Sequence, residues 1–242
     1  MALYPARRLL RRLLPRPLAL AIRARWLVWQ TTSGRTHQET DVDVLPQVIR
    51  TTDVCWDIGA NIGLYCIALA PLAASIEAFE PVPHNLAILG EVVRRLNLPT
   101  VAVHKLAVSD TSGHSRMTVP TEGFYGGYYL ATLSDGGDLL VQTGTIDQLV
   151  ADGLPRPDFV KVDVEGAEMS VVRGADTLIS TAPPIWLIET FEDTLIPYLR
   201  GRGYRCYLRI GPERLEEVEA RDPHQRNYWF FPSGRLPDQA TP

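Results

Sequence analysis

Cysteine is scarce in this sequence, and the few cysteines that occur form no recognisable pattern. Cys55, Cys66 and Cys206 are the only three in 242 residues, and no two of them have the CxxC spacing of a structural zinc site. Three such cysteines also argue against the disulfide framework of a small secreted domain. We therefore expect a protein of the reducing cytoplasm.

Long apolar runs, paired histidines and an excess of positive charge are missing as well. No apolar stretch reaches the roughly 20 residues that a membrane-spanning helix needs. The five histidines show neither HxH nor HExxH spacing, which argues against a histidine-based metal site. The formal net charge of -4 argues against a protein that coats DNA or RNA, so we expect no nucleic-acid partner.

The N-terminal segment departs from this average because it is strongly basic. Residues 1–30 contain seven arginines and no acidic residue, and leucine pairs recur at four-residue spacing between residues 9 and 14. On a helix this spacing gives an apolar stripe beside guanidinium groups. We interpret residues 1–40 as a basic helical extension. Weak contact with the inner membrane surface or with a synthase is one use for it, and packing on the domain or fraying is the other.

Past residue 40, short apolar runs rich in β-branched residues alternate with helical patterns. Strands are expected at 54–58, 75–79, 101–108, 159–164 and 185–188, and a closing edge hairpin at 204–210 and 228–231. Helices are expected at 62–72, 84–96 and 193–202, with another after the fourth strand. This pattern predicts an α/β domain over residues 41–242 with a mostly parallel sheet, helices on both faces and an insertion at 111–145.

The segment from residue 54 to residue 63 carries the strongest chemical signal. The first strand runs into a turn with Gly59, Asn61 and Gly63, after which a helix begins. Glycines let the backbone approach a ligand closely, and the amides that start a helix suit polar groups. The spacing is not the dinucleotide fingerprint G-x-G-x-x-G, and the turn lacks the lysine of a P-loop. A nucleoside-binding turn of another kind is therefore indicated.

Two acids at neighbouring strand ends narrow the choice of nucleoside. Asp57 lies near the end of the first strand and Glu80 follows the second. A carboxylate at the first position can hold the ammonium of an amino-acid-like ligand, and one at the second can accept both ribose hydroxyls. This pair favours S-adenosylmethionine over NAD. An NAD-dependent oxidoreductase on the same type of sheet remains the alternative.

Four sequence motifs occur in one order along the chain. They are WDIGANIG at 56–63, FEP at 79–81, AVSD at 107–110 and DFVKVDVEGAE at 158–168. Together they resemble the FkbM family of S-adenosylmethionine-dependent methyltransferases over residues 50–192. The resemblance implies a class I methyltransferase (Rossmann-like) fold with a seven-stranded sheet, and O-methylation in natural-product, glycan or lipid pathways. It assigns the methionine side of the cofactor to Asp57, Gly59, Asn61 and Gly63, the ribose to Glu80, and the adenine to Ala107, Val108 and Ser109.

The fourth strand supplies the candidate catalytic residues. Lys161, Asp163 and Glu165 alternate there, so we expect their side chains on one face near the crevice at the strand ends. Asp163 or Glu165 would take the proton of an acceptor alcohol as general base, and Lys161 would orient a carboxylate or the acceptor. Alternatively, residues 163–166 only cap the next helix, and Lys161 is their buried partner. A second alternative is a magnesium ion held by Asp163 and Glu189 at adjacent strand ends.

The acceptor is the least defined part of the prediction. We expect a hydroxyl of a small molecule or glycan, since no Asn/Asp-Pro-Pro-Tyr/Phe motif of the base amine methylases follows the fourth strand. Within the insertion, Phe124, Tyr125, Tyr128 and Tyr129 could cover the acceptor or simply cover the core. A non-catalytic scaffold that keeps the cofactor pocket remains a competing interpretation.

Overall fold

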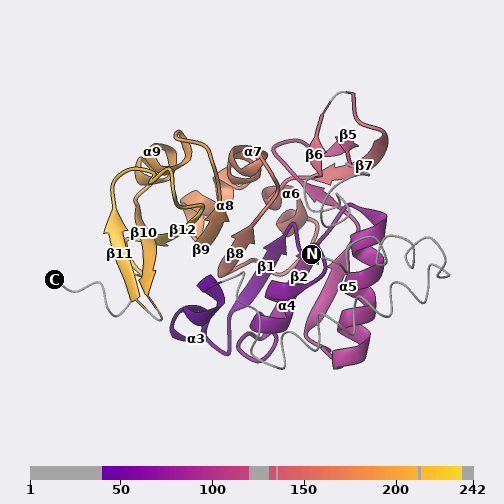
Figure 1. The fold of residues 1–242 in the computed structure, drawn as a ribbon, viewed down its shortest axis with the longest axis horizontal. Helices are drawn as coiled ribbons and strands as arrows, with labels where there is room; N and C mark the ends of the chain where they lie inside the picture. Colours follow the sequence, from indigo (N-terminus) through magenta and orange to yellow (C-terminus); the bar gives the residue numbers. More distant parts are fainter. Residues whose placement is uncertain (1–39, 120–130, 135, 212–213, 236–242) are drawn as a thin grey trace, which may run out of the picture.

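The structure is a computed structural model that describes residues 40–119, 131–134, 136–211 and 214–235 (Figure 1). The basic N-terminal extension therefore lies outside the described residues, apart from Thr40. The four aromatic residues singled out in the insertion lie outside them too. Within the described parts of the chain, no helix has both the length and the apolar character needed to cross a membrane.

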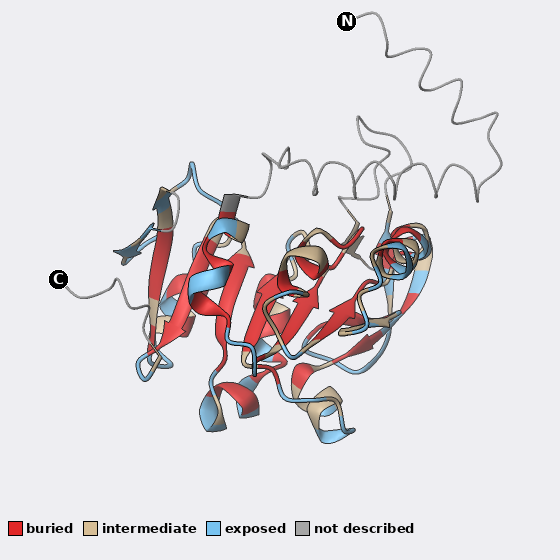
Figure 2. Ribbon diagram, turned by 90° about the horizontal axis from the view of Figure 1, so that it is seen from below, coloured by how far each residue is buried: buried red, intermediate tan, exposed pale blue. Residues whose placement is uncertain are grey.

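The domain is built on a sheet of eight strands in the order β11-β10-β12-β9-β8-β1-β2-β3. Five neighbouring strands run parallel, and their bounds are Val101–His104 (β3), Ser75–Phe79 (β2), Val54–Ile58 (β1), Phe159–Val162 (β8) and Ile185–Glu189 (β9). The central strands are buried along almost their whole length (Figure 2). This burial explains their nearly continuous apolar sequences. The predicted α/β fold with a mostly parallel sheet is confirmed.

Helices cover both faces of this sheet, as predicted. They are η1 (Thr40–Asp43), α3 (Leu45–Val48), α4 (Leu64–Leu69), α5 (Pro83–Leu96), α6 (Ile146–Ala151), α7 (Glu168–Arg173), α8 (Asp176–Thr181) and α9 (Leu195–Arg200). Helices α6 to α9 pack on the face that carries Trp56 and Ile58, whereas α3, α4 and part of α5 pack on the face that carries Cys55 and Ala78. Because successive strand residues point to opposite faces, the two cores interleave along each strand.

The two predicted C-terminal strands pair with each other in antiparallel orientation, as expected, but they do not form the edge of the sheet. The edge hairpin is β10 (Tyr204–Gly211) with β11 (Arg214–Val218), and β12 (Asn227–Pro232) inserts between β10 and β9, antiparallel to both. The segment between the two predicted strands thus contains a further strand, β11. This additional strand gives the sheet eight strands instead of seven.

The strand expected at 101–108 is in fact two strands in two sheets. Strand β3 ends at His104, and β4 (Ala107–Val108) pairs with β7 (Leu139–Gly144) instead of continuing beside β2. Buried Leu106 lies at the bend between them. With β5 (Gly113–Thr118) and β6 (Thr132–Leu133), these strands form a small sheet of order β4-β7-β5-β6. The described part of the insertion is therefore a small sheet beside the carboxyl end of β2 (Figure 1).

Candidate functional site

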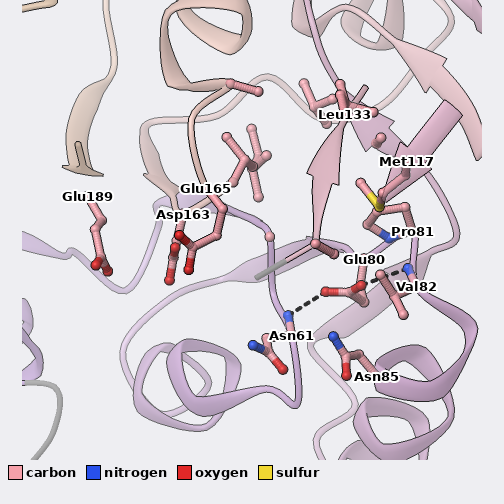
Figure 3. A pocket seen from close by; sticks show the side chains of 17 residues that line it. Asn61, Glu80, Pro81, Val82, Asn85, Met117, Leu133, Asp163, Glu165 and Glu189 are labelled. Atoms are coloured by element: carbon pink, nitrogen blue, oxygen red, sulfur yellow. Dashed lines mark hydrogen bonds between the residues drawn. The ribbon is translucent and has the colours of Figure 1, made fainter. Parts of the chain in front are cut away.

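A cavity opens at the carboxyl ends of the parallel strands, where ligands bind in open α/β sheets. Strand ends and the loops after them supply Ile58, Gly59, Asn61, Glu80, Pro81, Val82, Asn85, Asp163, Val164, Glu165, Ala167 and Glu189, and the small sheet and its ends supply Ala107, Val108, Met117, Ala131 and Leu133. Figure 3 shows the acids Asp163, Glu165 and Glu189 on one side of it and Asn61, Glu80 and Asn85 on the other. The cavity thus has an acidic side and a side suited to hydrogen bonding.

The turn after β1 is held by the end of β2. The amides of Gly59 and Ala60 both donate to the carbonyl of Phe79 at 3.0 Å, and the amide of Asn61 donates to Glu80 Oε2 at 2.9 Å. Asn61 has a positive φ of 50°, a conformation that asparagine tolerates better than most residues. Its side-chain Oδ1 is buried and has no hydrogen-bond partner among the described residues. Asn61 therefore lines the cavity with one polar atom unpaired within the described structure.

Glu80 is almost fully buried and hydrogen bonded by the backbone on both sides. Its Oε1 accepts from the amide of Val82 at 2.7 Å, and its Oε2 accepts from the amide of Asn61 (Figure 3). Burial raises the pKa of Glu80 to about 7, although these two amides and the side chain of Asn85 lower it. These three hydrogen bonds use three of the roughly four acceptor sites of a carboxylate, which leaves about one for a ligand.

Gly59 allows the turn after β1 to touch the segment after β8. A Cβ on Gly59 would lie 1.8 Å from the carbonyl oxygen of Asp163, and its φ of +81° is one that side chains rarely adopt. The amide of Asp163 in turn donates to the carbonyl of Ile58 at 3.0 Å. The predicted cofactor turn and the predicted catalytic residue are thus fixed to each other by backbone contact.

Gly63 and Ser109 do not line the cavity. Gly63 precedes α4 with a φ of +95°, and a Cβ there would lie 2.6 Å from Leu89 Cδ1, so this glycine serves the packing of α4 against α5. Ser109 is buried, and its amide donates to the carbonyl of Gly144 at 2.9 Å. Of the residues assigned to the adenine, Ala107 and Val108 line the cavity. The cofactor contacts of Gly63 and Ser109 stay predictions.

Asp57 also lies outside the cavity lining. It points to the face of the sheet that α4 covers, is 2% exposed, and accepts a hydrogen bond of 3.2 Å from the Cys66 thiol. Burial raises the pKa of Asp57 to about 6, while the Cys66 hydrogen bond and the charge of Lys161 lower it. Direct contact with a ligand ammonium stays a prediction for Asp57, and the structure gives it a buried position beneath the turn.

The expectation that Lys161, Asp163 and Glu165 share one strand face is wrong. Strand β8 ends at Val162, and Glu165 takes a left-handed conformation with a φ of 53°, so the alternation stops before Asp163. Lys161 is 1% exposed and faces α4; its Nζ donates to the carbonyl of Val162 at 3.1 Å and lies 4.9 Å from the ring centroid of Tyr65. The structure therefore brings only two of the three residues to the cavity.

Asp163, Glu165 and Glu189 form the acidic side of the cavity. Burial and the charges of Asp163, Glu189 and Glu168 raise the pKa of Glu165 to about 7, although Arg226 lowers it. Burial and Asp163 also raise the pKa of Glu189. A carboxyl group poised near neutral pH can accept a proton from a bound hydroxyl. The positive φ of Glu165 is a further mark of a functional position, since strained residues cluster at such sites.

The alternative of a magnesium ion held by Asp163 and Glu189 stays a prediction. Asp163 and Glu189 do lie at neighbouring strand ends and both line the cavity. Among the described residues, however, no group of three or more His, Cys, Asp or Glu side chains is placed to hold a metal ion.

Several residues of the cavity were not identified from the sequence. Asn85 is buried on α5 and hydrogen bonds to Glu80 through its side chain. Met117 and Leu133 come from paired strands of the small sheet. Asn85 lies only five residues after Glu80 in the sequence, and this short spacing could have identified it as a residue of the cavity. Met117 and Leu133 carry no such signal, because their position depends on how the small sheet folds back.

Comparisons with known proteins all point to one protein family. The family model described as "Methyltransferase FkbM domain" matches residues 57–206, more than half of the chain. The "Hexuronic acid methyltransferase AglP" of Haloferax volcanii is 31% identical over 148 residues, which cover 61% of this chain and 59% of that protein. The "31-O-demethyl-FK506 methyltransferase FkbM" of Streptomyces tacrolimicus is 29% identical over 215 residues, covering 72% of this chain and 82% of that protein.

Among solved structures, the chain is similar to the methyltransferase FkbM from Methylobacillus flagellatus. The TM-score is 0.53 at 21% sequence identity, and the match covers 76% of this chain and 44% of that one. This likeness supports the fold. The matched region thus spans less than two thirds of the Haloferax protein and less than half of the Methylobacillus chain.

Proposed function

This chain belongs to the FkbM family of methyltransferases, and from that premise we propose that it transfers the methyl group of S-adenosylmethionine to an oxygen of a small-molecule or glycan acceptor. The observation that carries the proposal is the two-sided cavity. Asn61 and Glu80 offer hydrogen-bond acceptors on one side, and Asp163 and Glu165 offer carboxylates on the other. The side with Asn61 and Glu80 suits a nucleoside. The side with Asp163 and Glu165 suits an acceptor hydroxyl that must lose its proton.

The residues of the first side fit the proposed cofactor. Glu80 has about one acceptor site left for a ribose hydroxyl, and the buried Oδ1 of Asn61 has no partner among the described residues. Ala107 and Val108 give an apolar wall for the adenine. When bound, S-adenosylmethionine supplies a methyl group on a positively charged sulfur. A cavity rich in carboxylates and without a described Lys, Arg or His in its lining favours such a cation.

The second side would prepare the acceptor. Glu165, with its pKa near neutral, takes the hydroxyl proton as the oxygen is methylated, and Asp163 beside it holds and orients the hydroxyl. Lys161 does not touch the acceptor in this proposal. Its ammonium lies 3.8 Å from Asp163 Oδ2, so it acts as a positioning residue for that carboxylate. Most of the rate enhancement would come from holding the reacting groups in line.

Oxygen as the accepting atom is supported by the named substrates of the relatives. One relative is named for a hexuronic acid and another for a 31-O-demethyl compound. Family membership also favours methyl transfer over the hydride transfer of an NAD-dependent oxidoreductase. We propose no nucleic-acid partner. A weak contact of the basic N-terminus with a membrane surface or a synthase stays part of the proposal.

Calorimetry on the full chain tests the cofactor. We expect S-adenosylmethionine and S-adenosylhomocysteine to bind and NADH not to bind, and we expect the double variant Asn61→Ala, Glu80→Ala to lose this affinity. Incubation with labelled S-adenosylmethionine and host extract fractions, followed by mass spectrometry, then identifies the methylated product. A folded protein with no affinity for either sulfur nucleoside would overturn the proposal. Retained cofactor binding without any methylated product would instead favour a scaffold.

A further inference from the structure

The rim of the cavity beyond Glu189 carries an exposed aromatic ring. Phe191 follows β9 by two residues and is 53% exposed, together with Leu140 and Ile210 one of three such large apolar side chains among the described residues. Scattered exposed apolar residues need no explanation. Phe191 differs from the other two because Glu189, two residues earlier, lines the cavity.

An arginine lies against this ring. The guanidinium carbon of Arg226 is 4.9 Å from the ring centroid of Phe191, and Arg226 Nη1 is 3.9 Å from Glu189 Oε1. The Arg226 side chain is 65% exposed, so this ion pair is weak and leaves most of the guanidinium donors free. An arginine in contact with a ring offers a ligand a planar set of donors with a fixed direction.

The backbone segments that carry Phe191 and Arg226 are paired with each other at the ends of β9 and β12. The amide of Thr190 donates to the carbonyl of Arg226 at 2.8 Å, and Glu189 is the register partner of Asn227 across β9 and β12. Thr190 is fully buried, and its Oγ1 accepts from the amide of Glu192 at 3.0 Å. The backbone that carries the ring and the guanidinium is therefore held in place beside the acidic side of the cavity.

The charge changes sign between the inside of the cavity and its rim. Inside, Asp163, Glu165 and Glu189 disfavour an anionic group next to the reacting oxygen. Outside, Arg226 lowers the pKa of both Glu165 and Glu189, so its charge acts on the same region. An acceptor with a neutral hydroxyl at one end and an anionic group at the other fits this arrangement, whereas a fully neutral one leaves Arg226 unused.

We propose that Phe191 and Arg226 form an acceptor subsite for an anionic sugar. The apolar face of the sugar ring stacks on Phe191, its carboxylate or phosphate pairs with Arg226, and the reacting hydroxyl is thereby directed to Asp163 and Glu165. Bidentate pairing of arginine with either anion is strong and directional. This inference rests on the proposed function, since it assumes that the acidic side of the cavity receives the acceptor.

The experiment uses the full chain saturated with S-adenosylhomocysteine and follows sugar binding by ligand-observed NMR. The probes are methyl glucoside, methyl glucuronide and methyl glucoside 6-phosphate, so that a carboxylate and a phosphate are compared with the neutral sugar. We expect at least one anionic probe to bind about tenfold more tightly than methyl glucoside. Arg226→Gln should remove this preference, and Phe191→Ala should weaken all probes about fivefold.

Two matched variants serve as controls. Arg94→Gln removes an exposed arginine that pairs with Glu91 on α5, and Ile210→Ala removes an exposed apolar side chain on β10. Neither should change sugar binding. The inference is overturned if the neutral sugar binds as well as both anions, if the preference survives Arg226→Gln, or if no probe binds to the nucleoside-loaded protein. Failure to bind S-adenosylhomocysteine at all would instead count against the proposed function.

Discussion

The ammonium of Lys161 lies 3.8 Å from the carboxylate of Asp163, yet only Asp163 reaches the cavity. The Lys161 side chain is 1% exposed, whereas that of Asp163 is 31% exposed. Lys161 is also the register partner of Asp57 across β8 and β1, and its charge lowers the pKa of that buried acid. One buried cation therefore acts on two carboxylates, Asp163 at the cavity and Asp57 buried beneath the turn after β1.

Replacing this lysine by an uncharged side chain of similar length should destabilise the fold in a pH-dependent way. For Lys161→Met we expect a loss of about 3 kcal/mol in the free energy of unfolding at pH 8, because removing one partner leaves buried charge uncompensated. At pH 5, below the pKa of about 6 of Asp57, that acid is protonated and the loss should be smaller. Urea denaturation at both pH values measures it.

The control for this change is Lys105→Met, which replaces the only other lysine in the sequence, an exposed one, and should cost almost nothing. An equal loss at pH 5 and pH 8 would show that the ammonium of Lys161 does not act through Asp57.

Glu165 should control the pH dependence of turnover. Its pKa is raised to about 7, and a general base must be ionised to act. With S-adenosylmethionine saturating, so that Glu80 does not contribute, we expect kcat/KM for the acceptor to rise about tenfold per pH unit below pH 7 and to level off above it. Glu165→Gln should lower kcat by about 100-fold or more and leave the affinity for S-adenosylhomocysteine within twofold. Asp163→Asn is the comparison: if it removes the inflection near pH 7 and Glu165→Gln does not, the two roles are reversed.

Cofactor affinity should depend on the ionisation of Glu80. The pKa of this acid in the free protein is about 7, and both hydrogen-bond acceptance from ribose and attraction of a cation favour its ionised form. Binding therefore releases a proton below pH 7, and we expect the affinity for S-adenosylmethionine to be about tenfold weaker at pH 6 than at pH 8. Calorimetry in two buffers of different ionisation enthalpy counts the proton. In Glu80→Gln the remaining affinity should no longer follow this curve; an identical pH profile would assign the proton elsewhere.

Gly59 should be far less tolerant of alanine than Gly166. A Cβ on Gly59 meets the Asp163 carbonyl at 1.8 Å, and neither backbone can move aside cheaply, whereas a Cβ on Gly166 meets nothing within 4 Å. Both have positive φ, so Gly166→Ala measures backbone strain alone, about 1 to 2 kcal/mol. Gly59→Ala should cost at least about 3 kcal/mol more. Thermal unfolding compares the two, and similar melting temperatures would refute the close contact.

The sequence predicts the parallel strands well because each is a short, mostly apolar run bounded by turn residues, although Asp57, Glu77 and Lys161 interrupt three of them. Strands β1 and β2 begin and end where predicted, at Val54–Ile58 and Ser75–Phe79. The break between β3 and β4 escapes this reasoning, since the apolar alternation continues from one into the other. Strand β11 escapes it too, because its sequence is mostly charged and its pairing with β10 depends on the tertiary fold.

For the candidate site, the rule that ligands bind at the carboxyl ends of parallel strands predicts that Glu80, Asp163 and Glu189 lie at one cavity. It does not decide which way Asp57 and Lys161 point. Both face α4, and a single sequence does not reveal which face of the sheet that helix covers. The rule places residues along a strand, while their direction depends on the packing of helices that follow later in the chain.

The place of β12 sets the order in which the protein can be assembled during synthesis. This strand is the last described one in the chain, yet it lies between β9 and β10 and pairs with both. A nascent chain that has emerged only as far as β11 leaves one side of β9 and one side of β10 open, and open strand edges invite association with other chains. Premature termination before residue 227 would thus leave β9 and β10 each with an unpaired side, which β12 covers in the complete sheet.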